Sequence, residues 1–396
     1  MKTYHWTAAV VFSLVAASCA KPDDLTRPAR LKGSPAFEAV RFTDLPGWRL
    51  DSVAAALPAF ARSCAVIAKR SPNVPMAINQ YAGIVQDWAD ACKAIPQSEL
   101  NAEQARGYFE TWFTPYRVMG NDPEMGLFTG YFEADLLGSR HKDKKFTIPI
   151  YRRPRDLVLV NLGDWRNDLA GRRISGRVIN GRLKPYYSRS DIRAGRLEGI
   201  VEPLVWLDDP VDAFFLHIQG SGRVRLSDGA AMRIGYDGHN GHAYYPIGRH
   251  LIETGAIPRE GMSMQKIRAW LEKNPTQKDT VMNLNGAYIF FREVRGDGPL
   301  GAQGVVLSPG RSLAVDPRAI PLGLPVWIDV NYPDEAGKRL RRLMVAQDTG
   351  GAIKGPVRAD IFWGNGSMAE RLAGPMKAGG SYFVFIPKGR VSSRSR

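Results

Sequence analysis

The chain of 396 residues lacks the motifs of several common enzyme classes. The segment Gly350–Gly355 has neither the spacing of a phosphate-binding P-loop nor the Ser or Thr that follows its lysine. Gly220-Ser221-Gly222 lacks the third glycine of a dinucleotide-binding fingerprint, and the chain contains no Gly-x-Ser-x-Gly nucleophile elbow. These absences argue against nucleotide-dependent enzymes and α/β-type serine hydrolases, and we expect no cofactor.

Cysteine and histidine are scarce, with three and six copies. Asp237–His242 contains two histidines, but no cluster with metal-ligand spacing accompanies them, so we interpret the segment as a polar surface loop and predict no metal site. If Cys19 is modified near the N-terminus, Cys64 and Cys92 remain as an even pair. In an oxidising compartment this pair favours a disulfide closing a loop of about 29 residues. Two buried free thiols are the alternative.

Long apolar runs are also missing, and the run Thr7–Ala17 is too short to cross a bilayer. It follows a basic start and precedes small residues, so residues 1–19 are typical of a signal peptide. Ala16-Ala17-Ser18-Cys19 resembles a lipobox, although Ala16 stands where leucine is usual. A lipidated Cys19, followed by Ala20, would anchor the chain on the periplasmic side of the outer membrane. Cleavage after Ala20 would instead give a soluble periplasmic protein.

Acidic residues are outnumbered, 39 against 54 Lys and Arg, which gives a formal net charge of +15. Such a charge favours anionic partners: nucleic acid, anionic lipid or an acidic polymer. Export argues against nucleic acid, and the aromatic residues form no recognisable stacking motif. We therefore expect no nucleic-acid partner.

The periodicity of apolar residues divides the chain into helical and strand-rich parts. Residues 20–39 are predicted to be a tether. Helices are predicted over Leu50–Lys69, Asn79–Ile95, Asn101–Phe113 and Ser263–Lys273, with a capping box at Asn101 and Gln104. Asn180-Gly181 predicts a type I′ hairpin. Further strands are predicted at Val305–Leu307, Val326–Val330, Leu343–Ala346 and Tyr382–Ile386, and residues 391–396 as a disordered tail.

Three aspartates lie near glycine-rich turns beside strand-like runs: Asp316, Asp348 and Asp360. Asp316 and Asp348 fit two interpretations equally, either a role in chemistry or hydrogen bonding to local backbone N–H groups in turns. Asp360 differs because the apolar run Ile361–Trp363 follows it. Apolar surroundings disfavour a charged carboxylate and raise its pKa, as a general acid for glycosidic cleavage requires.

Several segments together resemble the family of membrane-bound lytic murein transglycosylase A. They share its order and combination over about residues 120 to 387, and are Gly126–Ala134, Phe214–Gly222, Asn240–Tyr244, Ser312–Asp316 and Asp348–Gly364. The resemblance implies a mainly β (α+β) fold: a double-psi β-barrel with N-terminal helices, an inserted second β domain, and a groove between them. Residues 40–132 and 299–390 would form the barrel domain, and 133–298 the insert.

The resemblance also implies a function and a site. Peptidoglycan strands would be cleaved between N-acetylmuramic acid and N-acetylglucosamine, leaving 1,6-anhydromuramic acid ends, with Asp360 as the catalytic acid and base. Asp348 and Asp316 would assist it. The groove would be lined by Thr129, Gly130, Tyr131, Gln219, Gly220 and Gly351. We expect a monomer. The alternatives are a non-catalytic peptidoglycan-binding barrel and a hydrolytic muramidase.

Overall fold

The computed structural model describes residues 36–76, 81–96, 98–120, 126–169, 172–260, 262–296 and 298–388. The expected signal peptide, Cys19, most of the expected tether and the expected tail lie outside these ranges. No helix among the described residues is both long and apolar enough to cross a bilayer.

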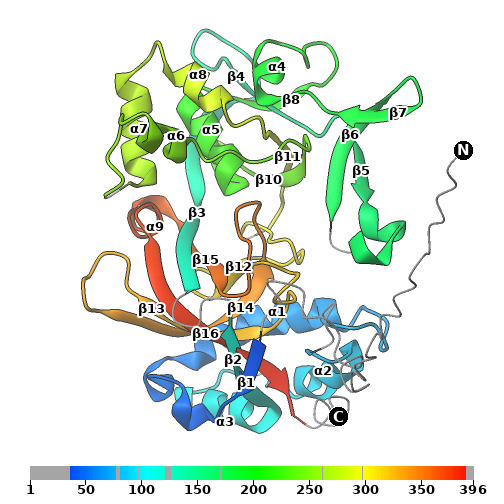
Figure 1. Cartoon of the computed structure of the whole chain (residues 1–396), viewed down its shortest axis with the longest axis vertical. Coiled ribbons are helices and arrows are strands. Elements are labelled where there is room, and N and C mark those ends of the chain that lie inside the picture. The colour runs from blue at the N-terminus through cyan, green and yellow to red at the C-terminus, as the bar shows by residue number, and fades with distance from the viewer. Residues whose placement is uncertain are drawn as a thin grey trace, which may run out of the picture.

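Six strands close into a barrel in the lower half of Figure 1. They are neighbours in the order β16-β13-β14-β12-β15-β3, and a further pairing of β3 with β16 completes the ring. Closure removes free sheet edges. The strands are β3 (Gly126–Ser139), β12 (Ser312–Val315), β13 (Pro325–Asn331), β14 (Arg339–Asp348), β15 (Arg358–Asn365) and β16 (Lys377–Pro387).

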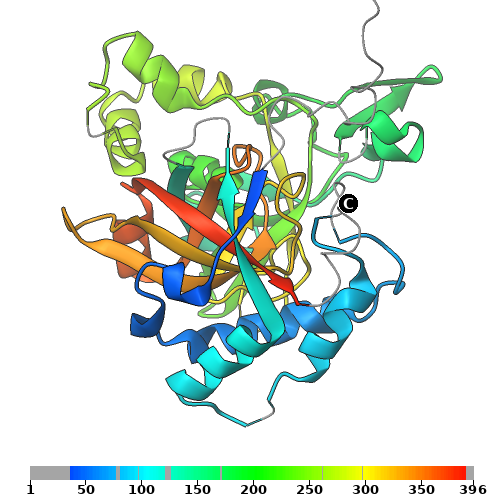
Figure 2. The same ribbon diagram turned by 60° about the horizontal axis from the view of Figure 1, so that its bottom comes forward.

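The N-terminal helices cover one side of this barrel, as the blue-to-cyan ribbons in Figure 2 show. They are α1 (Leu57–Ile67), α2 (Val85–Lys93) and α3 (Ala102–Trp112), followed by strand β2 (Phe113–Met119). Trp48, which precedes α1, packs against the barrel strand β13, and its ring centroid lies 5.2 Å from that of Trp327. Burial of such rings is the main source of stability at this interface.

A disulfide joins Cys64 of α1 to Cys92 of α2. The cysteines are 28 residues apart, and in the chain-entropy view closing a loop of that size contributes about 3 kcal/mol. The predicted capping box of α3 is confirmed: the Asn101 side chain accepts from Gln104 N–H at 2.9 Å, and the Gln104 side chain from Asn101 N–H at 3.1 Å.

Strand β3 leaves the barrel and continues into a second sheet, so one strand connects both parts in Figure 1. We call the second part the insert. Its sheet contains β4 (Ile148–Tyr151), β8 (Pro203–Leu207), β9 (Ser221–Leu226), β10 (Ala231–His239) and β11 (Ile289–Glu293). Its helices are α4 (Arg189–Arg193), α5 (Pro210–Gln219), α6 (Ile247–Glu253), α7 (Met264–Lys273) and α8 (Lys278–Asn283).

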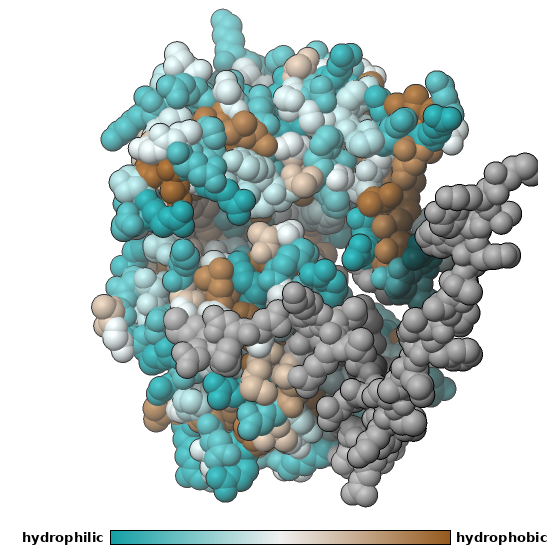
Figure 3. All heavy atoms as spheres, in the orientation of Figure 1, coloured by the Kyte–Doolittle hydropathy of each residue, from teal (hydrophilic) through white to brown (hydrophobic). Residues whose placement is uncertain are grey.

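A three-stranded sheet extends from the insert and comprises β5 (Val158–Asn161), β6 (Arg173–Ile179) and β7 (Arg182–Pro185). The predicted type I′ turn joins β6 to β7, with φ of 50° at Asn180 and 72° at Gly181. The register places Val158, Ile174, Val178 and Leu183 on one face, and all four are exposed. Figure 3 shows a brown, apolar stripe over this sheet.

Helix α9 (Gly366–Ala373) follows β15 and packs between the two parts. Its Ala369 and Ala373 lie in the same apolar cluster as Val224 and Ile234 of the insert. Trp363 contacts both this cluster and the core of the barrel domain. The barrel and the insert are therefore packed together at the C-terminal end of β15, the strand that carries Asp360.

Some sequence predictions differ from the structure: the helices predicted from Leu50 and Asn79 are α1 from Leu57 and α2 from Val85. Val305–Leu307 is not a strand, since only Val306 forms an isolated bridge to Leu300; the run is apolar because Val305 and Leu307 are buried. The end of the predicted tether, Ala36–Ala39, is strand β1 and pairs with β2. Helix α5 was not predicted, although Asp209 as N-cap, Pro210 at the first position and Gly220 at the end are its signals.

Candidate active site

Asp360 is held in the middle of β15 by strands on both sides. Its Cα is in register with Thr129 of β3 and with Ala314 of β12. The Thr129 hydroxyl donates to Asp360 Oδ1 at 2.7 Å. Ile361 and Phe362 are fully buried, while Asp360 itself stays partly accessible. A carboxyl group is thus presented from a rigid strand with its position fixed by a neighbour.

Arg358 approaches this carboxyl group only through Thr129. Its Nη2 donates to Thr129 Oγ1 at 2.9 Å, and its Nη1 to the carbonyl oxygen of Leu127 at 3.3 Å. Among the described residues Asp360 forms no ion pair with Arg358 or Lys354. Sequence reasoning missed this arrangement, and only the basic residue two positions before Asp360 hinted at it. Asp360 therefore keeps an oxygen that is free of a direct cation.

Burial raises the pKa of Asp360 to about 6, since the surrounding protein disfavours its charged form. The hydrogen bond from Thr129 and the positive charge of Arg358 act in the opposite direction, whereas the nearby charge of Asp348 adds to the increase. A carboxyl group with this pKa is present in both protonation states near neutral pH, so it can donate and accept a proton.

Asp348 ends β14 and is fixed by three donors. Its Oδ1 accepts from the N–H groups of Ala302 and Thr349 at 2.8 and 2.9 Å, and its Oδ2 accepts from the Tyr131 hydroxyl at 2.9 Å. Burial raises the pKa of Asp348, although these donors oppose the increase. Tyr131 lies near both carboxyl groups, and burial followed by their charges raises its own pKa.

Asp316 forms hydrogen bonds to backbone N–H groups in turns, as the second of its two interpretations expects. It is 2% exposed and forms a two-pronged ion pair with Arg318, at 3.0 and 2.7 Å. It also accepts from Gly355 N–H at 2.9 Å, in the loop before β15. Burial would raise the pKa of Asp316, but the bonds from Arg318 and Gly355 outweigh it and lower the pKa. This carboxylate secures a loop and is not poised to transfer protons.

Gly130 allows helix α9 and Trp363 to approach β3. A Cβ atom at this position would lie 2.7 Å from both Ala373 Cα and Trp363 Nε1. No real side chain can adopt such distances without moving α9 or the tryptophan. Gly130 is therefore a packing requirement of the site beside Asp360.

The other predicted groove residues lie at different positions. Gln219 is used within the protein: its Oε1 accepts from Phe132 N–H at 3.1 Å and its Nε2 contacts Met264 Sδ at 3.5 Å. Gly220 ends α5 with φ of 78°, and Gly351 lies in the exposed loop after Asp348. No atom lies within 4 Å of a Cβ built at either glycine. Both positions leave the backbone open to a ligand.

The loop with two histidines is a structural element rather than a simple surface loop. Asn240 is fully buried; its side chain donates to the carbonyl groups of Tyr187 and Gly286, and accepts from Tyr288 N–H. The side chain of His242 contacts the Tyr186 carbonyl at 2.8 Å. Within the described ranges no group of three or more His, Cys, Asp or Glu is arranged to hold a metal ion.

Comparison with known proteins shows which family this chain resembles. Residues 127–292 match the family model described as the MltA specific insert domain, and residues 311–385 match the 3D domain. A membrane-bound lytic murein transglycosylase A of Escherichia coli is 30% identical over 373 residues, which are 92% of this chain and 90% of that protein.

Solved structures agree with the sequence matches. A membrane-bound lytic murein transglycosylase from Agrobacterium tumefaciens has a TM-score of 0.80 and 34% identity, covering 89% of this chain and 98% of that one. MltA from Neisseria gonorrhoeae has a TM-score of 0.75 and 35% identity, covering 91% and 98%. E. coli MltA with bound chitohexaose has a TM-score of 0.66 and 27% identity, covering 93% and 100%.

The closed β-barrel with its inserted β domain, together with these matches, defines an enzyme on a mainly β scaffold. The chain belongs to the family of membrane-bound lytic murein transglycosylase A. The expected family and fold class are confirmed by these matches.

The raised pKa of Asp360 predicts that the wild type is destabilised as pH rises. From about pH 4 to 6 the unfolded chain has lost this proton while the folded protein still holds it, so the free energy of unfolding falls over this window. Asp360→Asn removes the buried charge and should be more stable than the wild type by roughly 1–3 kcal/mol at pH 8, and nearly equal to it at pH 4. Urea unfolding at both pH values measures the difference.

The exposed Asp90 on α2 gives the matched control, because Asp90→Asn should change stability equally at both pH values. An Asp360→Asn variant that is no more stable than the wild type at pH 8 would contradict the assigned burial of this charge.

Proposed function

We infer that this protein is a peptidoglycan lytic transglycosylase. It cleaves the β-1,4 bond between N-acetylmuramic acid and N-acetylglucosamine and leaves a 1,6-anhydromuramic acid end. Family membership supports the activity. The observation that carries the mechanism is Asp360: partly accessible, with a pKa near 6, and positioned by a hydroxyl group rather than by an ion pair.

One carboxyl group suffices because the nucleophile belongs to the substrate. Ordinary glycosidases use two, either to activate water or to form a covalent intermediate. Here protonated Asp360 gives its proton to the leaving O4 oxygen as the C1–O4 bond breaks. The resulting carboxylate then takes the proton of the C6 hydroxyl group as O6 bonds to C1. Asp360 ends protonated again, and no water is consumed.

We propose separate roles for the two other aspartates. Asp348, held by Tyr131 and two backbone N–H groups, would stabilise positive charge on the sugar ring as the bond breaks. Asp316 would act only on the loop that precedes β15, since its oxygens are occupied by Arg318 and Gly355.

The glycan strand is proposed to lie along β3 between barrel and insert. Thr129, Gly130 and Tyr131 lie beside Asp360 on this strand. Gly220 and Gly351 leave the backbone open, as close approach of a ligand requires. The chitohexaose bound to the E. coli relative supports a site for a chain of sugars. No observation favours a purely glycan-binding protein, for which an acidic group of raised pKa would serve no purpose.

The protein is proposed to act as a monomer anchored by a lipid on Cys19, on the periplasmic side of the outer membrane. The lipobox-like sequence and the words "membrane-bound" in the names of the relatives support this location. Cys19→Ala should move the protein from the membrane fraction to the soluble fraction of cells and leave its activity on purified sacculi unchanged. A wild type that is itself soluble would instead favour cleavage after Ala20.

Asp360→Asn should lower the formation of anhydro-ended products by a factor on the order of 10² to 10⁴ while the protein remains folded. Purified sacculi are digested, the products are identified by mass, and circular dichroism checks the fold. Asp90→Asn serves as the control with wild-type turnover. Wild-type-like turnover in Asp360→Asn would end the assignment, and reducing ends in place of anhydro ends would indicate a muramidase.

Thr129→Val should shift the pH dependence of kcat/KM. Asp360 must be protonated to act first as an acid, so the wild-type rate falls as pH rises through about 6. The Thr129 hydrogen bond lowers the pKa of Asp360, and its loss should move the alkaline limb upward by roughly 0.5–1 pH unit. Thr276→Val, at an exposed position between α7 and α8 of the insert, is the control. A limb that stays or moves downward would refute this role.

A further inference from the structure

Two ion pairs lie on one face of the insert sheet, next to an arginine that no acid faces. Glu133 of β3 pairs with Arg233 of β10 at 2.7 Å, and Asp135 of β3 pairs with Arg223 of β9 at 2.8 Å. Alternate residues of a strand share a face, so the next positions are Leu137 on β3 and Arg225 on β9, which are in register. Arg223 and Arg233 are in register with each other, and each is paired with an acid of β3. In the adjacent row, where Leu137 lies opposite Arg225, the arginine is present and no acid of β3 faces it.

Arg225 is consequently a cation without an internal partner. It is exposed, and it makes no ion pair and no side-chain hydrogen bond with any residue in the described ranges. Its neighbours in the sheet are apolar: Leu137 on β3, and Ala231 on β10. An arginine in such a place offers a planar pair of donors that matches a carboxylate.

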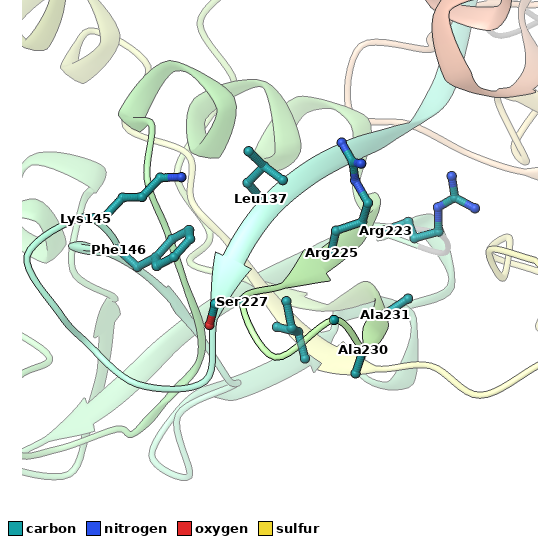
Figure 4. Close-up of a pocket in the computed structure, with 10 residues that line it drawn as sticks. Leu137, Lys145, Phe146, Arg223, Arg225, Ser227, Ala230 and Ala231 are labelled. Carbon is teal, nitrogen blue, oxygen red and sulfur yellow. The ribbon is translucent and has the colours of Figure 1, made fainter.

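Arg225 lies on the wall of a cavity of about 610 Å³. Figure 4 shows Arg223 and Arg225 on one side, Lys145 and Phe146 on the other, and Leu137 between them. Lys145 is 61% exposed; its ammonium group lies 3.7 Å from Asp208 and 5.0 Å from the centre of the Phe146 ring. The cavity thus combines an apolar floor with cations on opposite walls, which suits an anionic ligand with aliphatic groups.

We propose that this cavity, the Arg225 pocket, binds a carboxylate of the peptides attached to peptidoglycan strands. The proposal rests on the proposed function, which brings such strands to the protein. The peptide carboxylate would take the place of the acid that is missing opposite Arg225, and aliphatic groups next to it would contact Leu137 and Phe146. The same enzyme would then recognise peptide-bearing strands through a site outside the glycan groove.

The distance between the pocket and Asp360 indicates which peptide of the strand can reach the pocket. Leu137 is eight residues along β3 from Thr129, a distance of about 26 Å in an extended strand. A peptide of four or five residues spans at most about 13–18 Å. The bound peptide therefore belongs to a neighbouring sugar of the strand rather than to the one being cut at Asp360. The pocket would select strands that carry peptides beyond the cleavage point.

Two variants test the pocket without touching the catalytic machinery. Arg225→Gln removes the cation, and Leu137→Asp supplies the missing acid within the protein, so that Arg225 is paired and blocked. Leu137 is 41% exposed, and an acid there should be tolerated. Arg249→Gln, an exposed arginine on α6 of the same insert, is the matched control.

Binding is measured first, in an Asp360→Asn background that leaves strands intact. The probes are a synthetic stem peptide with free carboxylates and the same peptide with its carboxylates amidated. We expect Arg225→Gln and Leu137→Asp to weaken binding of the free-carboxylate peptide roughly three- to tenfold, with no change for Arg249→Gln and no binding of the amidated peptide. Equal affinity of the peptide for all variants would overturn the proposal. So would variants that bind the peptide as the wild type does but bind phosphatidylglycerol vesicles more weakly, because the pocket would then recognise a lipid.

Turnover is measured second, on sacculi and on the same strands stripped of peptides by an amidase. Both pocket variants should raise KM on peptide-bearing strands and leave peptide-free strands unaffected. An equal effect on both substrates would refute peptide recognition. A wild type that releases no anhydro products from either substrate would refute the proposed function instead, while the binding measurement would still decide about the pocket.

Discussion

The parallel pairing of β3 with β15 is the constraint on which the site depends. It sets Thr129 opposite Asp360 and so makes possible the 2.7 Å hydrogen bond between their side chains. The same pairing brings Gly130 and Tyr131 beside the site, where one admits α9 and the other reaches Asp348. Because β3 also continues into the insert, the position of the insert and the surroundings of the carboxyl group are set by one strand.

The electrostatics of the site show why a proton donor is better placed when its arginine binds a bridging hydroxyl group, here Thr129, than when the arginine pairs with it directly. Arg311 and Asp51 illustrate the direct arrangement, in which the guanidinium group contacts both carboxylate oxygens, at 2.7 and 2.9 Å. Asp316 and Arg318 do the same, and the pKa of Asp316 is lowered. Arg358 instead binds the hydroxyl group of Thr129, so burial prevails at Asp360 and its pKa rises. A proton donor requires this second arrangement.

Sequence signals predicted the structure correctly where a cap or a turn depends only on residues close together in the chain. The cap at Asn101 and the turn at Asn180-Gly181 follow from residues a few positions apart. The sequence also indicated a raised pKa for Asp360, because apolar neighbours alone produce one. Partners could not be predicted: Thr129 is 231 residues from Asp360, and only strand register joins them. For Asp316 the sequence left two roles open, and it gave no sign of the ion pair with Arg318 that occupies this carboxylate.

The continuity of β3 has a consequence for how substrate recognition and chemistry are related. Both ends of the strand are held: near Asp360 by β15 and by α9, which packs against Gly130, and in the insert by β8 and β9, where Gly138 admits Val224 and Trp206. A strand paired along both ends cannot bend freely between them. A ligand fixed on the insert is therefore fixed relative to Asp360, and binding at a distance can contribute to alignment of the bond that is cleaved.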